Sequence, residues 1–167
     1  WLLAEWAEND ALCAAIHDLP SKLEKAVQAD WSDACNALEG RHSVFCLGRG
    51  PAYAVSNEAA LKFKETCQIH AESYSSAEVL HGPVSIVDGG FPVIALGAKD
   101  EAETALAAVA DEIAAKGATV FATSDKVQKA TSLPAVRTGH ALTDPIALIA
   151  SGRVPFVVVP TSETLDR

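Results

Sequence analysis

The chain has 167 residues, of which 49% are hydrophobic, 21% are charged and 6% are aromatic. This composition is typical of a globular domain with one substantial core, and it excludes disordered and fibrous proteins. There are 13 lysines and arginines against 22 aspartates and glutamates, which gives a net charge of -9. The basic residues form no run, so nucleic acid is not expected as a partner.

The four cysteines, Cys13, Cys35, Cys46 and Cys67, form no Cys-x-x-Cys pair. We therefore expect structural thiols in a reducing cytoplasm and no metal site. No apolar run approaches the roughly 18 residues of a membrane span, so no membrane contact is expected. The sequence contains no methionine and opens within a helical pattern, and we expect it to be a piece of a longer chain.

Helical patterns occupy residues 1–39 in three pieces, and Pro20 with Ser21 predicts a helix start among them. The apolar run at 43–48 predicts a strand that leads directly into glycines. Pro51 then opens a long helix. A strand, a glycine turn and a helix together form half of a βαβ unit.

Strands and helices continue to alternate along the rest of the chain. The pattern predicts a strand at 92–97, an amphipathic helix at 100–117, a strand at 119–124 and a weaker strand at 133–138. A further apolar run at 156–160 is a candidate strand. Strands separated by helices predict a doubly wound α/β sandwich, with a parallel sheet of four or five strands covered on both faces.

Gly48 and Gly50 lie where the first predicted strand ends, which is the edge at which open parallel sheets bind ligands. The N–H groups of a helix start attract anions, so the turn is a candidate site for a phosphate or carboxylate. Position 53 holds Tyr53 where a dinucleotide-binding fingerprint requires a third glycine. The alternative is a turn that only connects strand to helix, and Pro51 removes one N–H donor.

Glu58, Lys62 and Glu65 are spaced i, i+4 and i+7, so they lie on one helical face. By spacing alone, a surface ion pair worth a few tenths of a kcal/mol is the more common explanation. An apolar stripe adjoins this face, however, and predicts a position near the edge of the core, where pKa values shift.

These residue types also suit proton chemistry on a sugar. A carboxylate such as Glu65 is a suitable base for moving a proton between adjacent carbons, with Lys62 either setting the charge state of Glu65 or neutralising a developing enolate oxygen. Histidine is a common residue type for acid–base chemistry, and His81 is a candidate for opening a cyclic sugar. The alternative is a loop histidine beside Gly-Pro.

Residues 47–88 closely resemble the second sugar isomerase (SIS) domain of glucosamine-6-phosphate synthase and of related amino-sugar phosphate isomerases and deaminases. In order, they contain a Gly-Arg-Gly turn, the helix Glu-x-Ala-Leu-Lys-x-Lys-Glu, the segment His-Ala-Glu, and Glu-x-x-His-Gly-Pro. A weaker similarity extends over about residues 1–149. The resemblance implies a flavodoxin-like three-layer αβα sandwich.

The resemblance also implies roles for matching residues. Glu65 matches the base that moves a proton between C1 and C2, and His81 matches a ring-opening histidine that reaches the active site of the partner subunit. Glu58 and Lys62 match residues that line and polarise that site. A homodimer that binds a sugar phosphate, without any cofactor, is therefore expected.

Further candidate residues for substrate binding are Gly48, Arg49, Gly50 and Glu78. Family enzymes carry two SIS domains, and a Ser-Gln-Ser-Gly-x-Thr loop of the first grips the phosphate. That loop has no counterpart in this sequence, and neither do the family's C-terminal lysine segment and glutaminase domain.

On this basis, residues 1–40 are expected to be a helical segment that leads from a first SIS domain, 41–149 an SIS domain, and 150–167 an unassigned tail. Two functions stay open. One is a phosphosugar isomerase that catalyses aldose-ketose isomerisation or deamination of amino-sugar phosphates, and the other is a non-catalytic sugar-phosphate sensor. A nucleotide-binding module ranks last.

Overall fold

A computed structural model describes residues 1–151, and the candidate strand at 156–160 lies outside them. The described residues form one five-stranded sheet in the order β2-β1-β3-β4-β5, in which every pair of neighbours is parallel. The chain order reverses at β1, as in a doubly wound sheet. The strands are β1 Ser43–Gly48, β2 His70–Ser75, β3 Pro92–Leu96, β4 Thr119–Ala122 and β5 Thr131–Ser132.

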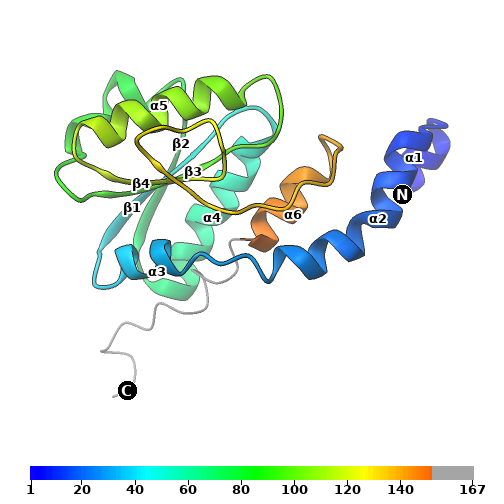
Figure 1. Cartoon of the computed structure of the whole chain (residues 1–167), viewed down its shortest axis with the longest axis horizontal. Coiled ribbons are helices and arrows are strands. Elements are labelled where there is room, and N and C mark those ends of the chain that lie inside the picture. The colour runs from blue at the N-terminus through cyan, green and yellow to red at the C-terminus, as the bar shows by residue number, and fades with distance from the viewer. Residues whose placement is uncertain (152–167) are drawn as a thin grey trace, which may run out of the picture.

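Helices cover both faces of the sheet. In Figure 1, α5 covers one face, α3 and α4 lie on the other, and α1 with the start of α2 extends away from the sandwich. The α-helices are α1 Leu2–Trp6, α2 Asp10–Ala26, α3 Ser32–Leu38, α4 Pro51–Cys67, α5 Glu103–Ala115 and α6 Asp144–Ser151. Two short 3₁₀ helices, η1 Val79–His81 and η2 Pro83–Ile86, follow β2.

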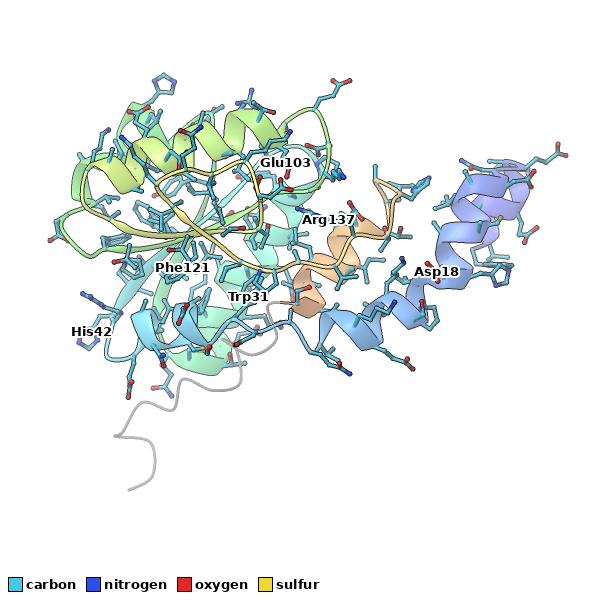
Figure 2. The ribbon with its side chains drawn as sticks, viewed as in Figure 1. Asp18, Trp31, His42, Glu103, Phe121 and Arg137 are labelled. Carbon is cyan, nitrogen blue, oxygen red and sulfur yellow. The ribbon has the colours of Figure 1, made fainter. Side chains whose placement is uncertain are left out.

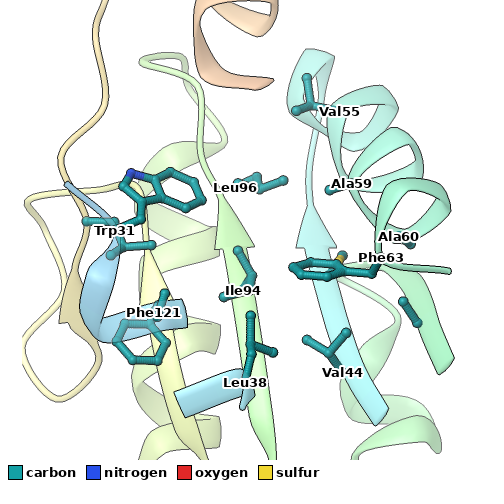
Figure 3. Close-up of a cluster of buried hydrophobic side chains, with 14 of the residues drawn as sticks. Trp31, Leu38, Val44, Val55, Ala59, Ala60, Phe63, Ile94, Leu96 and Phe121 are labelled. Atoms are coloured by element: carbon teal, nitrogen blue, oxygen red, sulfur yellow. The ribbon is translucent and has the colours of Figure 1, made fainter. Parts of the chain in front are cut away.

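Alternate residues of each strand point to opposite faces and divide the core into two clusters. On one face, β1, β3 and β4 pack against α3, α4 and α6, as Figure 3 shows for Trp31, Leu38, Phe63 and Ile94. On the other face, the intervening strand residues pack against α5 and η1. Helix α4 and the turn η1 therefore lie on opposite sides of the sheet.

The predicted parallel α/β sandwich is confirmed, and the first strand has the predicted bounds. The predicted strands at 92–97 and 119–124 are β3 and β4, and the predicted helix at 100–117 is the shorter α5.

The weak strand predicted at 133–138 is wrong. Strand β5 occupies Thr131–Ser132 instead. Pro134 follows, and it has no N–H to continue a ladder. Strand β2 was not predicted, because its sequence His-Ala-Glu-Ser-Tyr-Ser is polar, as suits a strand at the edge of the described sheet.

The N-terminal region also departs from the prediction. Three helices are present, but α2 continues through Pro20 and no helix begins there. Pro20 is exposed, so water can take the place of the hydrogen bond that the proline cannot donate. Trp31, Ala34 and Leu38 belong to the core, and the Trp31 indole donates to the Pro134 carbonyl at 2.8 Å.

Candidate active site

The structure brings Glu58, Lys62 and Glu65 together on α4. Lys62 Nζ donates to Glu65 Oε2 at 2.7 Å and lies 3.4 Å from Glu58 Oε1. The side chains of Glu58, Lys62 and Glu65 are 47%, 38% and 50% exposed. The cluster therefore borders the solvent, and no part of residues 1–151 shields the carboxylates from water.

The packing of α4 explains this exposure. Ala59 and Phe63, on the side of the helix that faces the sheet, are 1% exposed and belong to the core. Because i, i+4 and i+7 positions stack along one stripe, burying the apolar side turns all three charged groups outward together.

The neighbouring carboxylates of Glu65 and Glu58 favour the protonated form of Lys62. The hydrogen bond to Glu65 raises the pKa of Lys62 above its ordinary value, and the Glu58 carboxylate adds to this effect. Lys62 is therefore a stable cation at neutral pH, suited to stabilising negative charge and unsuited to acting as a neutral nucleophile.

His81 lies elsewhere. It ends η1, and its side chain is exposed, as is that of Glu78 just before this turn. Val79 of the same turn is fully buried against the sheet face that carries Phe45, opposite to α4. One chain thus places Glu65 and His81 on opposite sides of its sheet.

The glycine turn lies at the other end of α4. A Cβ at position 48 would come within 2.5 Å of the Ala52 carbonyl oxygen, so the close start of α4 requires glycine. Gly50 has a φ of 58°, and a Cβ there would lie 3.2 Å from Asp100 Oδ2. The half-buried Arg49 lies between the two glycines. A carboxylate thus already lies against the turn, which disfavours an anion there.

A helix rises about 1.5 Å per residue, so Glu65 is about 21 Å along α4 from Pro51. Strand β2 begins at His70, just after α4 ends, which places Glu65 near the amino ends of the strands. Gly48, by contrast, marks the carboxyl end of β1. A single hexose phosphate cannot contact both the glycine turn and Glu65 of one chain.

The structure also reveals a polar cluster that the sequence did not indicate. Glu103, on α5, is 5% exposed and lies close to Arg137 and Ser124 (Figure 2). These residues come from three separate segments and form no sequence motif, so only the fold brings them together.

Two further findings limit the kinds of site. In the described part of the chain, no group of three or more His, Cys, Asp or Glu residues is arranged to hold a metal ion. No helix within residues 1–151 is both long and apolar enough to cross a membrane.

Known proteins resemble this chain closely. The SIS domain family model matches residues 37–165. Glutamine--fructose-6-phosphate aminotransferases [isomerizing] from Idiomarina loihiensis and Symbiobacterium thermophilum are 37% and 36% identical over 71% and 86% of this chain. The chain spans only 20% and 25% of the length of these two relatives.

Solved structures share the fold. A protein from Silicibacter pomeroyi assigned as a phosphosugar isomerase is 61% identical, with a TM-score of 0.87 over 93% of this chain and 47% of its own. Glucosamine-6-phosphate deaminase from Thermotoga maritima, at 22% identity and a TM-score of 0.58, supports the fold alone. The SIS family model matches most of this chain, and the chain folds as a parallel αβα sandwich. This chain therefore belongs to the SIS domain family.

Proposed function

We propose that this chain is the proton-transfer half of a phosphosugar isomerase that acts on amino-sugar phosphates. The observation that carries the proposal is the shared ammonium group of Lys62, 2.7 Å from Glu65 and 3.4 Å from Glu58. The names of the isomerising aminotransferases and of the 61% identical protein support the substrate class. The free thiols of the described chain suit the reducing cytoplasm that we propose for it.

In this proposal, Glu65 removes a proton from the carbon beside the carbonyl or imine of the open-chain sugar and returns it to the neighbouring carbon. The substrate's own carbonyl or imine acidifies that C–H bond, so the step requires no cofactor. The Lys62 cation stabilises the oxygen or nitrogen on which negative charge develops. Glu58 holds the ammonium group from its other side.

We further propose that His81 opens the cyclic sugar in the site of a second subunit. Glu65 and His81 lie on opposite faces of one sheet, so a second copy of the chain is the simplest source of a histidine beside Glu65. Glu78, next to the same turn, is proposed to bind the sugar from the same subunit. Covering the exposed side of α4 would also remove water from the base.

The test is proton NMR of the purified protein in heavy water with fructose 6-phosphate, glucosamine 6-phosphate and galactosamine 6-phosphate. Deuterium is expected to enter at C1 or C2 of the preferred sugar, and Glu65→Gln should slow this exchange by about 10² to 10⁴-fold.

Glu112→Gln is the matched control, because Glu112 is 52% exposed and forms an i, i+4 pair with Lys116 on α5. This variant should exchange at the wild-type rate. Sugar phosphate binding without any exchange would instead support the sensor function.

A further inference from the structure

The two edges of the described sheet differ in length. Strand β5 ends one edge with only two residues, and Pro134 follows it closely. Strand β2 forms the other edge with six residues, His70–Ser75, in an unbroken parallel register with β1. Sheet edges are commonly protected by prolines, by bulges or by strands as short as β5. Strand β2 has none of these protections, so its edge is open to a further strand.

The hydrogen bonds at the two ends of β2 show which of its backbone groups are free. The N–H groups of His70 and Ser76 both donate toward β1, to carbonyl oxygens at 3.0 Å. Because alternate residues of a parallel strand bond to the same neighbour, Ala71 and Ser73 direct their N–H and carbonyl groups away from β1. In the part of the chain that the structure describes, no group outside the sheet bonds to them. They are therefore available to an added strand.

A groove of about 280 Å³ lies between this free edge and α4. Asn57 and Ala60 of α4, together with Ala71 and Ser73 of β2, line it. These side chains are small or short, and neighbouring strands lie only about 4.8 Å apart, so an extended backbone fits beside β2. Recognition by strand addition takes its affinity from main-chain hydrogen bonds and its specificity from side-chain contacts on alternate sides.

The groove carries one charge on each side of the strand. On the α4 side, no hydrogen bond or ion pair within the described residues engages the ammonium group of the exposed Lys64. On the other side, Glu72 accepts a hydrogen bond from Tyr74, whose ring packs on Phe45. The Glu72 carboxylate also lies 3.7 Å from His70 Nε2, and its side chain is 43% exposed. It therefore keeps room for a cation.

An added strand has the same alternation as β2, with neighbouring side chains on opposite sides of the sheet. An acidic side chain of that strand would meet Lys64 on the α4 side. The residue next to it would meet Glu72, which favours a basic side chain there. The two charges of the groove thus select a pair of oppositely charged neighbours.

We infer that the free edge of β2 binds an extended segment of another protein in which an acidic and a basic residue are neighbours. The backbone of the segment pairs with Ala71 and Ser73, its acidic residue contacts Lys64, and its basic residue contacts Glu72. None of these residues belongs to the proposed proton-transfer cluster, so the inference does not depend on the proposed reaction.

The test adds the synthetic peptide acetyl-Thr-Val-Glu-Lys-Val-Thr-amide to the ¹⁵N-labelled full chain and follows amide hydrogen exchange by NMR. The Ala71 and Ser73 N–H groups should exchange rapidly in the free protein and at least about tenfold more slowly with saturating peptide, with a dissociation constant of about 1 mM or lower. Glu72 and Tyr74, whose N–H groups face β1, should be protected in both states. The same peptide N-methylated at Glu and Lys cannot form the ladder and should protect neither residue.

The charge contacts are tested with variants of the protein. Lys64→Gln should weaken peptide binding about threefold, because one exposed ion pair is lost. Lys129→Gln is the control, since Lys129 is exposed in the loop that leads to β5, at the other edge of the sheet, and it should leave the affinity unchanged. Equal weakening by both substitutions would overturn the charge selection.

Three results would overturn the inference itself. In the first, the peptide protects neither Ala71 nor Ser73, or its shifts gather away from β2. In the second, both N–H groups are already protected without peptide and the protection grows with protein concentration, which would assign the edge to a second copy of the chain. In the third, they are protected at every concentration, which would assign it to another segment of the same chain.

Discussion

Lys62 holds two carboxylates with a single ammonium group. At the scale of single residues, Lys62 is kept as a cation, because its pKa is raised first by the hydrogen bond to Glu65 and then by the second contact to Glu58. Without a substrate beside them, the three residues are ordinary exposed ion pairs on a helix, which contribute little to stability. Activity, rather than stability, is therefore the property that distinguishes the two roles.

Lys62→Met is expected to lower kcat about 100-fold, because the cation beside the developing negative charge is lost. The melting temperature should barely change, since the side chain is 38% exposed. Steady-state kinetics and thermal unfolding measure the two quantities. Lys116→Met is the control, because this lysine forms an exposed i, i+4 pair with Glu112 on α5. A similar drop in kcat for both variants would argue against a catalytic role for Lys62.

Gly48→Ala is expected to lower the free energy of unfolding by about 1–3 kcal/mol, because the new methyl group clashes with the start of α4. The clash is with backbone, at 2.5 Å from the Ala52 oxygen and 2.7 Å from Tyr53 Cα, and cannot be relieved by a side-chain rotation. Urea denaturation measures the change. Gly89→Ala, where a Cβ meets nothing within 4 Å, should be nearly neutral. A neutral Gly48→Ala would show that α4 starts less closely against β1.

Among the elements, α5 and the loop that leads to β5 are joined by one carboxylate. Asp111 accepts hydrogen bonds from the N–H groups of Gln128, Lys129 and Ala130 at 2.7 to 3.0 Å. Partial burial alone would raise the pKa of Asp111, but these three backbone hydrogen bonds outweigh it and hold the pKa below its ordinary value. The ionised form thus stabilises the position of β5 at the edge of the sheet.

Asp111→Asn is expected to reduce the free energy of unfolding by about 1–2 kcal/mol at pH 7, since charge-assisted hydrogen bonds become neutral ones. A lowered pKa means that this stabilisation is present above the unfolded value, 3.8, and is lost as the pH falls through the folded value. Denaturation of wild type and variant at several pH values should therefore show a gap that closes in acid. Asp125→Asn, an exposed position near the same loop, should show no gap. A gap that persists in acid would show that the effect is steric.

At the scale of the whole molecule, the arrangement of the two sheet faces decides which residues can cooperate. Helix α4 packs on one face and η1 on the other, so a single chain separates Glu65 from His81. In a dimer, His81 of one subunit would lie beside Glu65 of the other if η1 of the first subunit approaches α4 of the second. This relation gives the proposed homodimer a functional test.

Mixing Glu65→Gln with His81→Asn subunits is expected to restore activity that neither variant has alone. With random exchange, about half of the dimers are mixed and each has one intact site, so activity recovers to about a quarter of wild type. Measuring turnover after unfolding and refolding the mixture together provides the test. Mixing each variant with itself is the control. If His81 acts within its own chain, no activity returns.

Much of the fold could be predicted because its signals are local. The apolar run at 43–48 and the glycines after it define a buried strand and a turn, and the i, i+4, i+7 spacing places Glu58, Lys62 and Glu65 on one face. The helix start predicted at Pro20 was wrong. An exposed helix such as α2 tolerates a proline that a buried helix would not, and exposure cannot be read from the local sequence. Polar β2 gave no strand signal, since its place in the sheet comes from pairing with β1.

By itself, therefore, the sequence determined the αβα class, the first strand, the glycine turn and the clustering of three charged residues on α4, all of which follow from short-range periodicity. Only the tertiary structure decided how far α4 separates the glycine turn from Glu65, and that His81 lies across the sheet from Glu65. It also brought Glu103 and Arg137 together. These relations depend on how the sheet is ordered and which face each helix covers, and such long-range packing leaves no periodic signal in the chain.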